Sequence, residues 1–341
     1  MLHFDSDYME GCHPEILKKL AEINMDKNTG YGTDAYCESA KEKILTACGL
    51  NEGEVYFLTG GTQTNAAVIS AVLKKYEGVI AADSGHISVH EAGAVEYTGH
   101  KVLVIPNKEG KIEAEALKKY LLNFHNDCNN AHMVYPGMVY ISFPTEYGTL
   151  YSARELKDIH SVCREYNIPL FIDGARLGYG LMSAESDVTL EYISHNCDIF
   201  YIGGTKAGAM FGEAVVIPRK GLIPHFFTMI KQQGALLAKG WLLGVQFDIL
   251  FTNNLYFNIA KNAVSIADKM KKIFIDKGYR LYINSPTNQI FVILPDDKIK
   301  ELSSKVSFGF WERYDESSAV VRFAVSWAAS EDYIKKLSEL L

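Results

Sequence analysis

Long apolar runs are missing from the sequence. No apolar stretch of about 18 residues occurs among the 341 residues, so we expect no segment that spans a membrane. An excess of positive charge is missing too, because 34 lysines and arginines face 41 acidic residues and give a formal net charge of −7. This balance argues against nucleic acid or an anionic membrane as a partner. The first residues, MLHFDSDYMEG, carry acids where a signal peptide would carry positive charge.

Paired cysteines are missing as well. The six cysteines are scattered along the chain without a C-x-x-C pair: Cys12, Cys37, Cys48, Cys128, Cys163 and Cys197. In a chain of this length, such spacing is typical of reduced, mostly buried thiols and not of a disulfide framework. We therefore expect a cytoplasmic protein.

The sequence does contain a regular alternation of short apolar runs and amphipathic stretches of helical length. Seven runs are predicted as strands, at residues 54–58, 79–82, 101–105, 137–143, 168–173, 197–202 and 213–217. Residues 113–125, 153–166 and 187–195 fit helices between them. Near-continuous apolar strands indicate burial on both faces, so the pattern predicts an α/β fold with a mainly parallel sheet covered by helices. The short glycine-rich connection before residues 213–217 allows one antiparallel strand.

The pattern changes after about residue 240. Residues 254–278 form one long amphipathic stretch that predicts a helix ending at Gly278. Strands at 289–294 and 319–325 and a terminal helix follow. We expect a large α/β domain over residues 51–240 and a small α+β domain over residues 241–341.

The stretch YIGGTKAGA, residues 201–209, places Lys206 at the mouth of a buried strand. This lysine is either a surface residue on a loop or a reactive amine. A free lysine amine has a pKa of about 10.4, and desolvation lowers that pKa. A lowered pKa is what a lysine that forms a Schiff base needs.

The stretch FLTGGTQTNAAVISAVL, residues 57–73, is a strand, a glycine pair and a helix that opens at about Thr62. A helix N-terminus offers free N–H groups and a positive dipole end to an anion such as phosphate. The spacing matches neither of the common nucleotide-binding glycine patterns. The alternative is a tight turn in which Thr62 only caps the helix.

Two further segments carry charges in apolar surroundings. Asp173 closes a buried strand in FIDGARLGYG, so it needs a cation or a strong donor, and the simplest partner within the chain is Arg176. Arg322 lies inside the apolar strand AVVRFAV. It needs a carboxylate, either within the chain or on a ligand, which its planar fork can hold with two hydrogen bonds.

The segment DSGHISVHEAGA offers His86, His90 and Glu91. The two histidines are four residues apart and could ligate a metal, but the H-E-x-x-H order and a third ligand are missing. We expect no metal. His86 is better explained as an aromatic lid over a planar ligand or as a core histidine.

Together, these features suit one cofactor. A phosphate cradle, an aspartate for a protonated ring nitrogen, a stacking imidazole, a lysine amine and carboxylate-binding arginines fit pyridoxal phosphate with an amino-acid substrate. A non-catalytic metabolite-binding α/β protein and a metal-dependent hydrolase are the competing interpretations from other classes.

Over almost its whole length, the chain resembles the low-specificity L-threonine aldolases, within the aromatic-amino-acid β-eliminating lyase/threonine aldolase group of fold-type-I, aminotransferase-like enzymes. The segments that carry the resemblance are FDSDYMEGCHP, TGYGTDAY, LTGGTQTN, SGHISVHEAGA, PTEYGT, IDGARLGYG, GGTKAG and VVRF. By this resemblance, Lys206 forms the Schiff base with the cofactor, Asp173 pairs with the ring nitrogen and His86 stacks on the ring. Gly61 and Thr62 hold the phosphate.

The resemblance also implies a substrate site and an assembly. Ser6, Arg176 and Arg322 would bind the substrate carboxylate, with Arg176 also bordering the cofactor. Tyr31 and Gly32 match a loop that reaches the substrate site of a neighbouring subunit. This match implies a homodimer or homotetramer with shared active sites, to which residues 1–50 contribute.

The activity implied is cleavage of L-threonine or L-allo-threonine to glycine and acetaldehyde. The alternative is β-elimination from an aromatic or other amino acid. Where the relatives carry a histidine near the β-hydroxyl, this chain has Glu146, which could act as base if its pKa is raised; water held by Glu146 or His86 is the other possibility. Lys231 or Lys239 would supply the positive charge near the phosphate; the alternative is that Lys239 is a plain surface residue.

Overall fold

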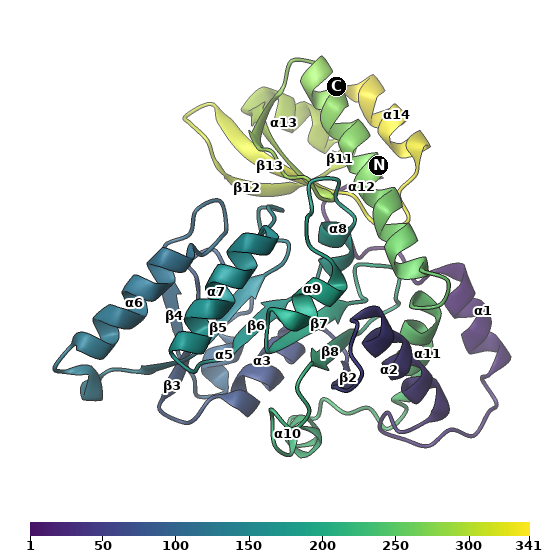
Figure 1. The fold of residues 1–341 in the computed structure, drawn as a ribbon. Helices are drawn as coiled ribbons and strands as arrows, with labels where there is room; N and C mark the ends of the chain where they lie inside the picture. The colour runs from purple at the N-terminus through teal and green to yellow at the C-terminus, as the bar shows by residue number, and fades with distance from the viewer.

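The computed structural model describes all 341 residues, and a seven-stranded sheet forms its centre (Figure 1). The strand order is β2-β8-β7-β6-β5-β3-β4. The strands are β2 (Glu54–Leu58), β3 (Glu77–Ala82), β4 (Val102–Ile105), β5 (Tyr135–Ser142), β6 (Leu170–Asp173), β7 (Ile199–Gly203) and β8 (Glu213–Ile217). Only β8 runs antiparallel to its neighbours β2 and β7. The predicted mainly parallel sheet with one antiparallel strand is confirmed.

Helices cover both faces of this sheet. They are α1 (Pro14–Glu22), α2 (Ala35–Ala47), α3 (Gly61–Val72), α4 (His86–Val89), α5 (Ala94–Tyr97), α6 (Ala114–Asn126), α7 (Ala153–Glu165), α8 (Leu177–Leu181), α9 (Leu190–His195), α10 (Phe226–Gln232) and α11 (Trp241–Leu250), with a 3₁₀ turn η1 (Asn130–His132). Alternate strand residues enter two separate cores: Ile80 and Val139 face one, and Val79 and Met138 face the other. Burial on both faces explains why the strands are near-continuous apolar runs.

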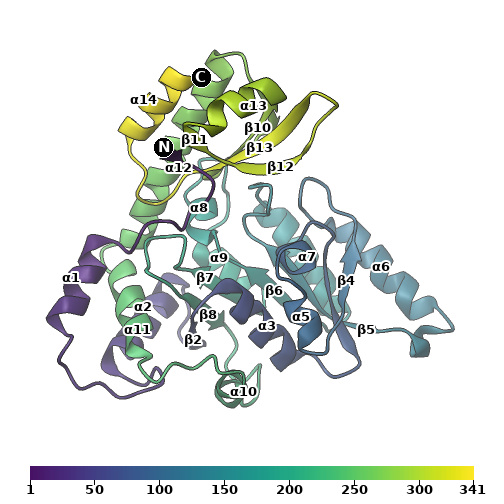
Figure 2. The same cartoon turned by 180° about the vertical axis from the view of Figure 1, so that it is seen from behind.

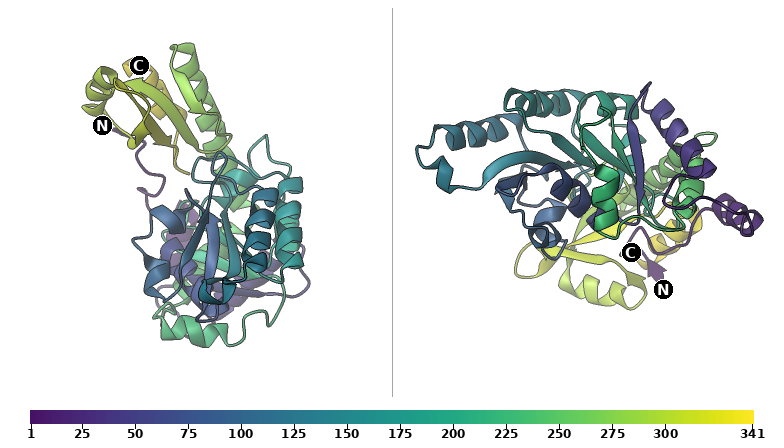
Figure 3. Two further views of the ribbon diagram at one scale, coloured as in Figure 1. Left: turned by 90° about the vertical axis from the view of Figure 1, so that its left-hand side faces the viewer. Right: turned by 90° about the horizontal axis from the view of Figure 1, so that it is seen from below.

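A smaller part of the molecule stands on the large one, as the side view of Figure 3 shows. Its four-stranded antiparallel sheet has the order β12-β13-β10-β9. Its elements are α12 (Leu255–Asp276), β9 (Arg280–Ile283), β10 (Gln289–Pro295), α13 (Asp296–Ser303), β11 (Val306–Ser307), β12 (Gly309–Arg313), β13 (Ser318–Ala324) and α14 (Glu331–Leu340). The long helix and the strands at 289–294 and 319–325 were predicted; β9 and β12 were not.

The N-terminal segment joins the two parts. Strand β1 (Leu2–His3) pairs in parallel with β11 of the smaller part, and the chain then crosses to α1 on the large part (Figure 2). Residues 4–13 therefore run past the junction where the two parts meet. The domain limits at residues 50 and 240 stay a prediction.

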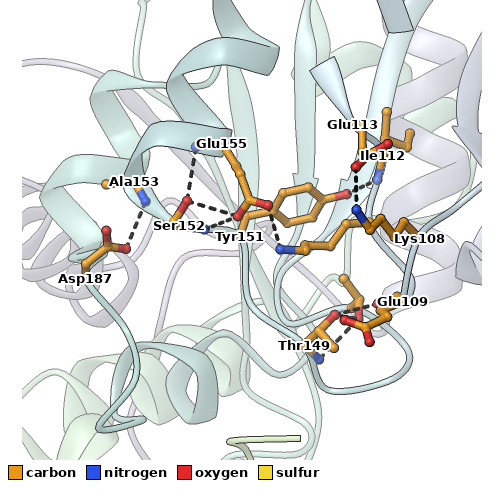
Figure 4. A network of polar contacts seen from close by, with 12 residues as sticks. Lys108, Glu109, Ile112, Glu113, Thr149, Tyr151, Ser152, Ala153, Glu155 and Asp187 are labelled. Carbon is orange, nitrogen blue, oxygen red and sulfur yellow. Dashed lines mark hydrogen bonds and ion pairs between the residues drawn. The ribbon is translucent and has the colours of Figure 1, made fainter. Parts of the chain in front are cut away.

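The connection from β5 to α7 is fixed at its far end by a capping box (Figure 4). The Ser152 hydroxyl accepts a hydrogen bond from the Glu155 N–H at 3.2 Å, and the Glu155 carboxylate accepts from the Ser152 N–H at 2.7 Å. Lys111 donates to Glu155 at 2.6 Å, and the adjacent Tyr151 hydroxyl accepts from the Ile112 N–H at 2.7 Å. These contacts satisfy the first N–H groups of the helix and hold the loop that carries Glu146.

None of the helices combines the length and the apolar character that a crossing of a bilayer requires. All six cysteines are free thiols, and four of them are buried.

Candidate active site

A cavity of about 380 Å³ opens at the carboxyl ends of the strands of the large sheet. Ligands bind at this edge of open α/β sheets. Residues singled out in the sequence line it, among them Gly61, Thr62, His86, Glu146, Asp173 and Lys206. Arg176 lines it as well, and an adjoining cavity of about 560 Å³ brings in Arg322 from the smaller part. The two parts of the molecule thus form one site.

Lys206 lies three residues beyond the end of β7, and its ammonium group makes no hydrogen bond or ion pair within the chain. Burial and the neighbouring Arg176 cation hold the pKa of Lys206 below its ordinary value. Two glycines allow the backbone to form this corner. Gly203 N donates to Gly174 O at 2.9 Å, and a Cβ atom on Gly174 would lie 1.9 Å from the Tyr201 carbonyl oxygen.

Asp173 ends β6 and accepts four hydrogen bonds. The hydroxyls of Tyr140 and Tyr201 donate to its two oxygens at 2.5 Å each, Asn65 donates at 3.0 Å and the Ala175 N–H at 2.9 Å. Burial opposes the charge, but nearby His86 and these donors outweigh it and hold the pKa of Asp173 below its ordinary value. The expected need for strong donors is met. The suggested partner Arg176 is wrong, because neighbouring strands supply the donors.

His86 opens α4 and is oriented by a buried carboxylate. Its Nδ1 lies 2.7 Å from Glu91 Oε1, and Asn65 Nδ2 bridges that same oxygen at 2.8 Å and Asp173. Although burial lowers it, the contact with Glu91 raises the pKa of His86. The ring of His90 lies 5.8 Å from that of His86, and no group of three or more His, Cys, Asp or Glu side chains could hold a metal ion.

Arg176 is already held by a carboxylate of the N-terminal segment. Its Nε and Nη2 donate to the two oxygens of Asp7 at 2.7 and 3.0 Å, and Asn288 donates to Asp7 at 2.9 Å. Asp7 is completely buried. Burial opposes its charge, but Arg176 outweighs burial and keeps the pKa of Asp7 well below its usual range. The sequence analysis missed Asp7, although it adjoins Ser6.

Arg322 has no carboxylate partner within the chain. Its Nη1 donates to Gln289 Oε1 and its Nη2 to the Asp5 carbonyl, both at 3.3 Å, and its buried Nε has no partner. Burial and the Arg176 cation lower the pKa of Arg322. The Ser6 hydroxyl is also buried without a partner. Because unsatisfied buried donors are costly, these groups fit an anionic ligand.

Glu146 lies behind His86. Its Oε1 accepts from the His86 N–H at 2.9 Å and from the Ser142 hydroxyl at 2.6 Å. Burial raises the pKa of Glu146 despite these donors. The carboxyl group therefore holds a proton more readily than an ordinary glutamate.

The glycine turn presents free N–H groups to the cavity. Helix α3 begins at Gly61 with Gly60 as its N-cap, and no side chain caps it. The suggestion that Thr62 is the cap is thus wrong, since the helix starts one residue earlier. The N–H groups of Gly61, Thr62 and Gln63 have no backbone partner, so this helix end can hold a phosphate.

Ser6 lines neither cavity, and four further residues of the sequence prediction lie elsewhere. Tyr31 and Gly32 line a separate pocket, and the Lys231 ammonium lies 3.8 Å from the Tyr31 ring centroid. Lys231 and Lys239 are both exposed. A single chain does not bring these residues to Lys206.

The geometry fits pyridoxal phosphate: free helix N–H groups for the phosphate, an ionised Asp173 for the ring nitrogen and an unpaired Lys206 amine for the aldehyde. The fold agrees. An aspartate aminotransferase from Thermus thermophilus superimposes with a TM-score of 0.73 at 15% identity, over 100% of this chain and 92% of that chain. Fold and site define a fold-type-I, pyridoxal-phosphate-dependent enzyme.

The chain belongs to the beta-eliminating lyase family, whose family model matches residues 3–279. It is similar to the low specificity L-threonine aldolase of Pseudomonas aeruginosa, with 27% identity over 342 residues that cover 98% of this chain and 95% of the relative. The solved structure of a Leishmania major threonine aldolase superimposes with a TM-score of 0.96 at 41% identity, over 100% of this chain and 98% of that chain. The protein is therefore a pyridoxal-phosphate-dependent lyase, as the resemblance implied.

Proposed function

We propose that the protein is an aldolase that cleaves the Cα–Cβ bond of β-hydroxy-α-amino acids, L-threonine or L-allo-threonine, to glycine and an aldehyde such as acetaldehyde. One observation carries this proposal. Arg322 Nε and the Ser6 hydroxyl are buried without partners, and Arg322 borders a cavity that is also lined by Lys206 and the half-buried Glu146. This combination supplies a carboxylate anchor, an amine and a base.

Pyridoxal phosphate, when bound, supplies an aldehyde that condenses with an amine and a ring that takes up the electrons of a bond broken at Cα. In this proposal, the neutral Lys206 amine binds the aldehyde and Asp173 pairs with the ring nitrogen. His86, held by Glu91, covers the ring. The free N–H groups at Gly61 and Thr62 bind the phosphate.

Arg176, Arg322 and Ser6 bind the substrate carboxylate. Arg176 is immobilised by Asp7 through two hydrogen bonds, so it offers its remaining N–H groups in a fixed direction. A fixed carboxylate determines which bond of Cα stands perpendicular to the ring. Selection of the Cα–Cβ bond gives aldol cleavage.

Glu146 takes the proton of the β-hydroxyl group, directly or through a water molecule. The raised pKa of its carboxyl group, caused by desolvation, brings its proton affinity closer to that of a base working near neutral pH. His86 remains the second candidate for holding this water, since its side chain lines the same cavity as Glu146.

We also propose a cytoplasmic homo-oligomer with shared sites. Tyr31, Gly32 and one of Lys231 and Lys239 lie outside the cavity of their own chain but would complete that of a neighbour. The exposure of these lysines and the resemblance of the TGYGTDAY segment support this arrangement.

The test is an absorbance spectrum of the purified protein with pyridoxal phosphate, before and after addition of each threonine isomer, with glycine and acetaldehyde assayed in parallel. We expect a visible band that Lys206→Ala abolishes, together with acetaldehyde release. A band with pyruvate and ammonia as products would identify β-elimination instead. The absence of a band would refute the role of Lys206.

A further inference from the structure

Glu213 is a buried carboxyl group that the proposed chemistry leaves without a role. It is the first residue of β8 and is 3% exposed. In the sheet it stands opposite Leu58, the last residue of β2, on one side and opposite Gly203, the last residue of β7, on the other. Strand β2 leads into the glycine turn and β7 leads to Lys206, so Glu213 lies between the two.

The contacts of Glu213 leave it without a cation. Its Oε1 accepts from the Thr205 hydroxyl at 2.8 Å and its Oε2 from the Gly204 N–H at 3.1 Å. No lysine or arginine nitrogen forms an ion pair with it in the chain. The side chain nevertheless lines the cavity that contains Gly61, Thr62 and Lys206.

Burial, more than the surrounding charges, favours the uncharged form of Glu213. Burial raises the pKa of Glu213 to about 8; the Lys206 cation opposes this effect, and the Asp173 carboxylate adds to it. The hydroxyls of Tyr201 and Tyr256 also face it, and burial raises the pKa of both, so they stay neutral. A phosphate dianion at the glycine turn would be a further like charge and would favour the protonated carboxyl still more.

We propose that Glu213 is a further cofactor-positioning residue, which donates a hydrogen bond from its uncharged carboxyl group to the phosphate held at the glycine turn. The inference rests on the proposed placement of that phosphate at Gly61 and Thr62. A neutral acid at this position can donate, whereas its anion would repel the phosphate. Binding of the phosphate is therefore strongest while Glu213 is protonated, and it weakens as the pH rises and the carboxyl group ionises.

The experiment measures the binding of pyridoxamine 5′-phosphate to the full-length protein, freed of cofactor, by calorimetry between about pH 7 and pH 9.5. This probe carries an amine in place of the aldehyde, so it cannot condense with Lys206. Its phosphate has a second pKa of about 6 and stays a dianion throughout. Because burial also lowers the pKa of Lys206, the decisive comparison is between the wild type and Glu213→Gln, which is always neutral and always a donor.

We expect the wild type to lose about tenfold more affinity than Glu213→Gln between these pH values. At pH 7 the affinities of the wild type and Glu213→Gln for the probe should agree within about threefold. Glu213→Ala should bind the probe about 10-fold or more weakly than the wild type, which is the range of one hydrogen bond to a charged group. Pyridoxamine without the phosphate should show no difference between the wild type and Glu213→Gln. Glu77→Gln, a buried glutamate in β3 outside the cavity, serves as the matched control and should bind like the wild type.

Two outcomes would overturn the inference. A loss of more than tenfold in the affinity of Glu213→Gln at pH 7 would show that the anion is the working form. An equal pH dependence of the wild type and Glu213→Gln would show that Glu213 does not act on the phosphate. The visible spectrum of the wild type with pyridoxal phosphate tests the cofactor assignment separately. Failure of that assignment can therefore be distinguished from failure of the role of Glu213.

Discussion

Replacing Asp7 by asparagine tests how the substrate arginine is held. Asp7 and Arg176 form a bidentate pair in which the side chains are 0% and 14% exposed. The substitution keeps the shape of the side chain and one acceptor oxygen but removes the charge. Removing one partner of a buried ion pair costs about 3–5 kcal/mol, because the other charge is left uncompensated. Since asparagine retains one hydrogen bond, we expect a loss at the lower end of this range, about 3 kcal/mol in the free energy of unfolding.

The pH dependence gives this prediction a second signature. The pKa of Asp7 is well below its usual range in the folded protein and about 3.9 in the unfolded chain. A depressed pKa stabilises the fold above the unfolded value and loses this contribution as the pH falls toward the folded value. The difference in stability between the wild type and Asp7→Asn should be constant between about pH 6 and pH 8 and should shrink below about pH 4.

The assay is urea unfolding of both proteins, with the KM for L-threonine measured at neutral pH. A loosened Arg176 should raise KM about tenfold or more, because the carboxylate anchor is lost from the bound substrate. The matched control is Asp296→Asn. Asp296 pairs with Arg313 in the same bidentate manner, at 2.7 and 3.1 Å, but both side chains are about half exposed, so its urea midpoint should not change measurably. Equal midpoints for the two variants would refute the reasoning.

Three further predictions concern other parts of the site and the fold. Burial raises the pKa of Glu146, so the kcat/KM of the wild type should rise with pH as this carboxyl group ionises to a base. Glu146→Gln should lose this rise and should be about 100-fold or more slower. Profiles of rate against pH measure both effects. Tyr201→Phe removes a donor to Asp173 at 2.5 Å and should weaken pyridoxal phosphate about tenfold in an absorbance titration. Ser152→Ala removes the capping box of α7 and should cost about 1 kcal/mol in urea unfolding without a change in the visible spectrum.

The large sheet could be predicted because burial on both faces leaves a strong signal. The strands at 79–82, 137–143 and 168–173 consist of apolar side chains that enter both cores, so the sequence reads as continuous apolar runs between polar helices. Strands β9 and β12 lie at the edges of the small sheet and keep partly exposed side chains. Their sequences therefore lack such a run and were missed.

The candidate site was predictable where one residue carries its own signal. Lys206 and Asp173 stand out because each is a charge at the end of a buried strand. The Asp7–Arg176 pair joins residues 169 positions apart, and no local sequence pattern predicts such a contact. Arg176 follows Asp173 by only three residues, which suggested the wrong partner; the donors come instead from Tyr140 and Tyr201 on adjacent strands.

The site contains several carboxyl groups within one region, and the charges and donors around each carboxyl group decide what it can do. Burial opposes the charges of Asp7 and Asp173. The Arg176 cation beside Asp7, His86 near Asp173 and the hydrogen bonds that both carboxylates accept outweigh burial and lower both pKa values, so the two aspartates remain anions. Glu146 and Glu213 have fewer donors and no adjacent paired cation, and burial raises the pKa of both. Titratable groups whose environments push their pKa values apart are the ones that divide acid and base roles. On this argument, the two aspartates keep the charges of the site in place, while the two glutamates are the groups that can hold or release a proton.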